Sequence, residues 1–152
     1  MGWFSRTRSP KDDWSAMSSV TRVEAKLQEL GEITPARRAG VIYRDNGDIS
    51  FLSNIEAELK TVLHVGESAT KTAFSIKDDE RGMRWIILED GNFDDLVSSV
   101  YTVGNAIGSN QGGDNLLAAV FEMYFTGEVD DRTYRSGLRT YWIYRYDRKA
   151  FY

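Results

Sequence analysis

The sequence predicts an α+β fold, in which helices pack on a mostly antiparallel β-sheet. Two observations predict it. Apolar residues recur at helical spacing in three segments, and pairs of β-forming segments joined by short turns follow each of them. At 152 residues, 41% of them apolar, the chain is long enough to form one domain around a single core. We expect a basic, aromatic leader over residues 1–14 and a single α+β domain over residues 15–152.

Each of the three helices is predicted from an apolar face and from signals at its ends. The first runs over residues 15–30. The second begins at the capping-box pair Ser53 and Glu56, and the third begins at Asn92 and stops at Gly108. The residues on their apolar faces are Val20, Val23, Leu27 and Leu30; Ile55, Leu59, Val62 and Leu63; and Leu96, Val100, Val103 and Ile107.

The strands are predicted in three pairs, namely residues 41–44 with 49–52, 72–77 with 83–89, and 116–125 with 138–152. A loop bracketed by Pro35 and Gly40 precedes the first pair. Asp45-Asn46-Gly47-Asp48 joins its two members and is a strong hairpin pattern. The glycine-rich residues 108–113 are interpreted as a flexible connection from helix to strand. We expect a core of Val23, Leu27, Leu59, Phe74, Trp85, Ile87, Leu96, Val100 and Val103.

The last fifteen residues, LRTYWIYRYDRKAFY, combine tyrosine with basic side chains in one β-forming segment. Along a strand, Tyr141, Ile143 and Arg145 alternate with Trp142, Tyr144 and Tyr146, so one set faces away from the helices. We expect that outward face to be covered by a partner, either a second copy or another protein. The predicted partner-binding residues of this end are Tyr141, Trp142, Tyr144, Arg145, Tyr146, Arg148, Phe151 and Tyr152.

The other end is also basic and aromatic. Trp3, Phe4, Arg6 and Arg8 are predicted to contact a partner or, weakly, a membrane surface. The alternative is a frayed terminus that folds back on the sheet. The net charge of the chain is −4, so an acidic body lies between two basic ends. This layout argues against nucleic-acid binding, which needs a continuous basic face.

Catalytic motifs are absent from the sequence. With no cysteine and one histidine, His64, we expect no metal site, no cofactor and no enzymatic activity. His64 is interpreted as a residue at a helix end, and the acidic pairs Asp78-Asp79, Asp94-Asp95 and Asp130-Asp131 as turn or helix-cap residues. The less favoured alternative is a small hydrolase that uses His64 and one acidic pair.

Several segments together resemble the PspAB family, whose members are associated with the membrane-stress protein PspA. They are MGWFSR, GVIYRDNGDISF, MRWIILEDGNFDDLVSSVYTVGNAI, LLAAVFEMYF and YWIYRYDRKAFY. The resemblance implies a fold like that of YbjN and type III secretion chaperones. This sequence departs from the family pattern in two places. Family members continue past the position of Tyr152 into a proline-rich and helical extension, and they more often have glycine where this chain has Lys149, which argues against a tight turn there.

From this resemblance we expect a non-enzymatic adaptor that binds PspA or a related membrane-stress component. The alternative is a secretion-chaperone-like module, monomeric or dimeric, that holds a client segment. The sequence contains neither a membrane-spanning run nor a secretory signal, so we expect a cytoplasmic protein, with possible peripheral contact at the inner face of the membrane.

Overall fold

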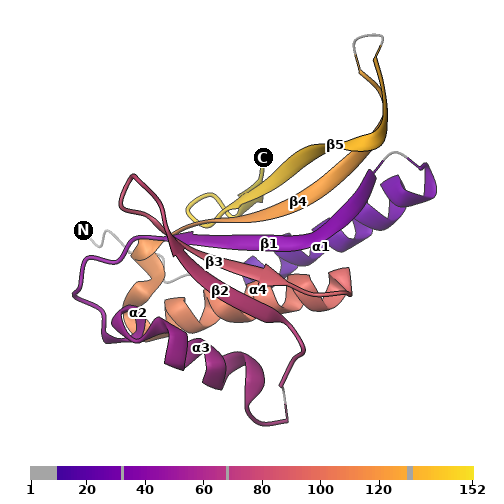
Figure 1. Ribbon diagram of the computed structural model, residues 1–152. Helices are drawn as coiled ribbons and strands as arrows, with labels where there is room; N and C mark the ends of the chain where they lie inside the picture. Colours follow the sequence, from indigo (N-terminus) through magenta and orange to yellow (C-terminus); the bar gives the residue numbers. More distant parts are fainter. Residues whose placement is uncertain (1–9, 32, 68, 130–131) are drawn as a thin grey trace, which may run out of the picture.

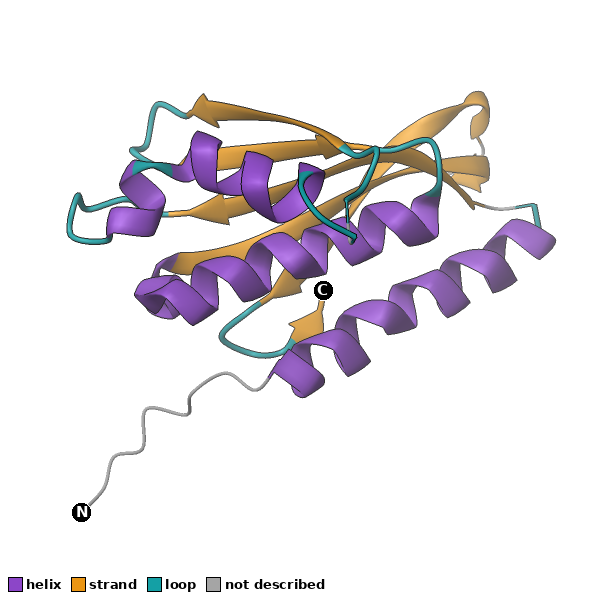
Figure 2. Ribbon diagram, turned by 90° about the horizontal axis from the view of Figure 1, so that it is seen from below, coloured by secondary structure: helices purple, strands orange, loops and turns teal. Residues whose placement is uncertain are grey.

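A six-stranded antiparallel sheet carries the helices on one of its faces (Figures 1 and 2). The computed structural model describes residues 10–31, 33–67, 69–129 and 132–152. The order of strands across the sheet is β2-β3-β1-β4-β5-β6. In chain order the elements are α1 (Pro10–Glu29), β1 (Ile33–Tyr43), α2 (Ser50–Ser53), α3 (Ile55–His64), β2 (Ala73–Asp78), β3 (Arg84–Glu89), α4 (Phe93–Ile107), β4 (Leu116–Val129), β5 (Arg132–Arg145) and β6 (Ala150–Phe151). The predicted α+β class is confirmed.

Helix α1 begins earlier than predicted, at Pro10 instead of Ser15. Proline suits a first helical position, because its fixed φ matches the helix and its missing N–H has no intrahelical partner there. The residues assigned to the end of the leader are therefore helical. Trp14 is one of them, and its ring packs edge-on against Tyr101 of α4 with 5.1 Å between centroids.

The predicted hairpin after residue 40 is wrong. Its first half belongs to the long strand β1, and its second half forms the short helix α2. Asp45 and Gly47 do make a turn, since the Gly47 N–H donates to Asp45 Oδ1 at 2.9 Å. After it, Phe51 and Leu52 are both buried. Consecutive residues of a strand point to opposite faces, so a helical turn is needed to bury both.

The predicted loop from Pro35 to Gly40 is likewise part of β1. Its register against β4 shifts between Pro35 and Ala39, and Arg37 in this bulge has a φ of 62°. Pro35 is tolerated because the first residues of β1 pair only with β4, leaving the proline on an edge where no N–H is required.

The two predicted helix N-caps, at Ser53 and Asn92, have different outcomes in the structure. Ser53 does not form a capping box, because its hydroxyl donates to the carbonyl of Ile49 and α3 begins after Asn54. At α4, by contrast, the predicted cap is confirmed. The Asp95 N–H donates to Asn92 Oδ1 at 3.0 Å. Past Ile107 the glycine-rich segment continues as two short helical turns, Gly108–Gly112 and Gly113–Asn115, which connect α4 to β4 as predicted.

Strands β2 and β3 form the predicted pair, but the inward face of β3 is the opposite of the one predicted. Ile86 and Leu88 are fully buried beneath the helices. Trp85 and Ile87 point to the other face, where the Trp85 ring lies over Gly40 of β1. Trp85 is anchored there because its Nε1 donates to Asp79 Oδ2 at 3.1 Å. A shift of one residue exchanges the two faces of a strand, which is why both residues leave the predicted core together.

The core lies between the sheet and the helices. Of the predicted core residues, Leu59, Leu96, Val100 and Val103 are fully buried, and Leu27 and Phe74 pack against them half-buried. Val23 is 49% exposed, so its assignment to the core is wrong. The largest fully buried side chains include three tyrosines, which are Tyr43, Tyr144 and Tyr146.

The C-terminal segment is two strands and a turn instead of one long strand. Strand β5 ends at Arg145, residues 146–149 turn, and β6 pairs back onto β5. Lys149 closes this turn with a φ of 51°, a left-handed conformation that glycine adopts more easily. The tight turn therefore forms without the glycine that the family pattern implies.

Candidate binding groove

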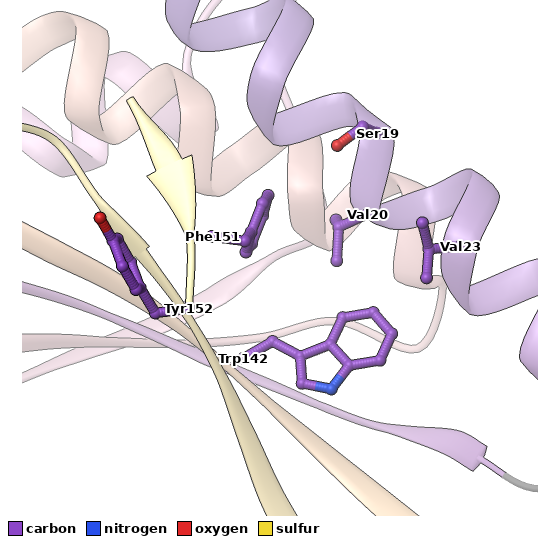
Figure 3. Close-up of a pocket in the computed structure, with 6 residues that line it drawn as sticks. All are labelled: Ser19, Val20, Val23, Trp142, Phe151 and Tyr152. Atoms are coloured by element: carbon purple, nitrogen blue, oxygen red, sulfur yellow. The ribbon is translucent and has the colours of Figure 1, made fainter. Parts of the chain in front are cut away.

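An open apolar groove lies between α1 and the C-terminal hairpin (Figure 3). Its volume is about 320 Å³, and it is lined by Ser19, Val20, Val23, Trp142, Phe151 and Tyr152. All of these residues except the serine are apolar or aromatic. In Figure 3 Val20 and Val23 project from α1 toward the Trp142 and Phe151 rings. A cavity of this size and composition fits one or two bulky apolar side chains.

The groove exists because β6 folds back along β5. Ile143 and Tyr152 exchange two backbone hydrogen bonds, of 3.1 and 2.7 Å, and these fix the last residues beside Trp142. Phe151 then points toward the helices, with its ring 5.3 Å from Tyr144 and 6.1 Å from Phe121. The floor of the groove is thus tightly packed, while its α1 rim at Val23 stays exposed.

A buried hydrogen bond attaches the two ends of the described chain beneath the groove. The Tyr144 hydroxyl donates to Asp13 Oδ1 of α1 at 2.7 Å. Both residues are buried, and they lie 131 positions apart in the sequence. Because a charge-assisted bond of this kind is strong and directional, it sets the position of α1 against β5.

The structure separates the predicted binding residues of the C-terminal end into three groups. Trp142, Phe151 and Tyr152 line the groove. Tyr141 and Arg145 are on the opposite face of the sheet, and Arg148 is exposed in the turn. Tyr144 and Tyr146 are buried in the core, so they are not available to bind a partner as predicted. Trp3, Phe4, Arg6 and Arg8 lie outside the described residues.

The α1 side of the groove was missed by the sequence patterns. They place Val20 and Val23 together on the packed face of the helix and give no role to Ser19. One signal is present in the sequence. The apolar positions Met17, Val20, Val23 and Leu27 of α1 are followed by Leu30 just beyond the helix, and Val23 and Leu30 remain exposed.

His64 and the acidic pairs do not converge in the described part of the chain. His64 ends α3, and its Nε2 lies 2.7 Å from the carbonyl oxygen of Thr72. The Thr72 hydroxyl bonds to Asp90 and Ser99, at 2.7 and 2.6 Å, in a buried network that holds this connection to α4. Asp78 pairs with Arg84, and Asp94 and Asp95 occupy the first turn of α4.

Asp79 holds the β2–β3 turn. It accepts hydrogen bonds from the Trp85 side chain and from the backbone of Met83 and Arg81, and these bonds lower the pKa of its carboxyl group. Asp130 and Asp131 lie outside the described residues.

Among the residues described, no three His, Cys, Asp or Glu side chains gather as a metal site. None of the described helices combines the length and the apolar character that crossing a membrane requires.

The fold and the groove together define a small α+β protein with one layer of helices on an antiparallel sheet, whose open site is apolar. The family model of PspA associated protein B, PspAB, matches residues 1–152, the whole chain. The chain belongs to the PspAB family. No curated protein and no solved structure matches it, so the likeness to YbjN and secretion chaperones stays a prediction.

Proposed function

We propose that this chain is a non-catalytic adaptor of the PspA system that binds PspA through the groove between α1 and β6. The family name points to the partner, since members are named for their association with PspA. The observation that carries the proposal is the apolar groove itself. Its lining offers packing surface and little hydrogen-bonding chemistry, which suits an anchor side chain of a protein better than a polar substrate.

The mode of binding that fits this geometry is a helix or an extended segment laid along α1. Such a segment would insert one or two apolar side chains between Val23 and Trp142. Val23, which is 49% exposed, would lose most of its contact with water in the complex. Together with the one or two apolar side chains that the partner inserts, its burial contributes about 3 kcal/mol, enough to serve as the centre of a modest interface.

Binding measured with purified PspA from the same organism tests this proposal. We expect Val23→Asp to weaken binding at least tenfold, because it places a charge against Trp142 and removes apolar contact. Val65→Asp is the matched control, since Val65 is also an exposed valine but does not line the groove. Its affinity should equal that of the unmodified chain.

The ways in which this experiment can fail are separable. If the unmodified chain does not bind PspA, the assignment of the partner is wrong. If it binds and Val23→Asp binds equally well, PspA is the partner but the groove is not its site. Peripheral contact with a membrane through Trp3, Phe4, Arg6 and Arg8 is a separate prediction, which vesicle sedimentation of the full chain would measure.

A further inference from the structure

The second half of α1 contributes one buried side chain to the protein, and that side chain is a glutamate. Among residues 21–29, Glu24 is buried at 6% exposure, whereas Thr21 and Leu27 are half-buried and the other six residues are exposed. Val23, the apolar residue beside Glu24, is itself 49% exposed. A surface helix usually docks through an apolar stripe, so this half of α1 lacks the usual source of stability.

The first half of α1 is attached differently. The Tyr144 hydroxyl donates to Asp13 Oδ1 at 2.7 Å, and the ring of Trp14 packs against Tyr101 of α4 with 5.1 Å between centroids. Met17 is fully buried in the core. The two halves of the helix therefore differ in how firmly they dock, and the second half depends mainly on Glu24.

Glu24 is buried without a hydrogen-bond partner for one of its oxygens. Its Oε1 atom is shielded from solvent, and no described residue donates a hydrogen bond to it. Asp94, in the first turn of α4, acts on Glu24 with a like charge. Burial and this like charge, in that order, raise the pKa of the Glu24 carboxyl group. Ionised Glu24 is therefore an unfavourable charge at the contact between α1 and α4.

The charged residues on the neighbouring elements do not offset this charge. The elements that pack most extensively against α1 are α4, β1 and β6. The charged residues of α4 are Asp94 and Asp95, which already occupy the end of the helix dipole that favours negative charge, and β6 has none. On β1, Arg38 pairs with Glu89, and Arg37 is exposed in the bulge. The residues one turn before and after Glu24 on α1 are uncharged.

We propose that Glu24 makes the docking of α1 sensitive to protons, so that the second half of the helix docks firmly when this side chain is neutral and loosens when it is ionised. The docked helix binds the proton more tightly than the undocked helix does. The stability that the proton supplies is therefore fully present below pH 4.5 and is lost as the pH rises through the raised pKa of Glu24. At neutral pH the second half of α1 is the less stable half.

This device acts on one wall of the groove. Val23 is the neighbour of Glu24 in sequence, Val20 lies one turn before it, and both line the groove. Loosening of the second half of α1 moves the Val23 rim relative to Trp142, whereas strand pairing fixes β5 and β6. Docking of α1 is measurable in the chain alone, so its test is independent of PspA.

The first experiment is amide hydrogen exchange of the full chain at about pH 7. Glu24→Gln keeps the length of the side chain and removes its charge, so it should slow exchange across residues 21–29 at least about threefold, and less across the first half of α1. Glu29→Gln, at an exposed site on the same helix, is the matched control and should exchange like the unmodified chain. Exchange in Glu24→Gln that is as fast as in the unmodified chain would overturn the proposal.

The same comparison at lower pH separates the charge from the packing of the new amide. The advantage of Glu24→Gln over the unmodified chain, taken at each pH, should shrink as the pH falls toward 4.5, because Glu24 itself then becomes neutral. An advantage that persists undiminished at pH 4.5 would mean that packing, and not protonation, controls the helix.

A second pair of variants tests the contribution of α4. Asp94→Asn removes the like charge that acts on Glu24 and should slow exchange across residues 21–29 at neutral pH. Asp95→Asn is the control, because it removes the adjacent acid from the same first turn and should leave these amides unchanged. Equal effects of the two substitutions would show that Asp94 is not the residue that opposes Glu24.

Discussion

Tyr43 is a buried phenol at the end of β1, and its hydroxyl has no hydrogen-bond partner among the described residues. Burial raises its pKa to about 12, although the guanidinium of Arg84, 5.9 Å from the ring centroid, acts in the opposite direction. The protonated form is therefore favoured more strongly in the folded than in the unfolded chain. The stability that this difference contributes is fully present below pH 10 and is lost as the pH rises from 10 to about 12.

We predict that Tyr43→Phe changes the free energy of unfolding by less than about 1 kcal/mol at pH 8, because no hydrogen bond to a described residue is lost. Above pH 10 the unmodified chain should lose stability faster than the variant, by about 1.4 kcal/mol for each pH unit up to about pH 12. Urea unfolding at pH 8 and pH 11 measures the difference. Parallel losses in the two proteins would contradict the role given to Tyr43.

At the scale of elements, the turn between β5 and β6 decides whether the groove forms. Lys149 holds a left-handed conformation there, which costs a residue with a Cβ about 1 kcal/mol or more. Without this turn, Phe151 and Tyr152 would not lie beside Trp142, and the groove would lose one wall.

We predict that Lys149→Gly is more stable than Lys149→Ala by about 1 kcal/mol, because both variants lose the side chain but only alanine keeps the steric conflict. Thermal unfolding of the two variants gives the comparison. The same pair of substitutions at Arg148, where φ is not positive, should favour alanine or show no difference. If glycine has no advantage at 149, the left-handed turn is not a source of strain.

At the scale of the whole molecule, the hydrogen bond from Tyr144 to Asp13 joins the first helix to the last long strand. Contacts that close so long a stretch of chain form only when the rest of the fold is in place. This bond therefore reports on the docking of α1 as a unit, and with it on one wall of the groove.

We predict that Tyr144→Phe lowers the free energy of unfolding by about 1.5 to 3 kcal/mol, the range for bonds to charged groups. Amide hydrogen exchange should increase in α1 more than in α4. Tyr152→Phe, at a residue 67% exposed, is the control and should change stability by less than about 0.5 kcal/mol. A neutral Tyr144→Phe with unaltered exchange would show that α1 docks without this bond.

Features that depend on neighbouring residues could be predicted from the sequence. Helix α4, its cap at Asn92, the pairing of β2 with β3 and the alternation along β5 all result from periodicity and short-range hydrogen bonds. Membership of the PspAB family is also a property of the sequence alone.

Other features depend on contacts between segments that are distant in sequence. These contacts decide which face of a strand is buried and whether a strand or a helix follows a given turn. Trp85 and Ile86 are both apolar, and only the partner strands place Ile86 inside. Asp45 and Gly47 can form the same local turn before a strand or before a helix, and burial of both Phe51 and Leu52 selects the helix. Tyr144 has the sequence context of a surface residue, but Asp13, which is distant in sequence, supplies a buried partner for its hydroxyl. Register and burial depend on such long-range contacts, and these are absent from any local pattern.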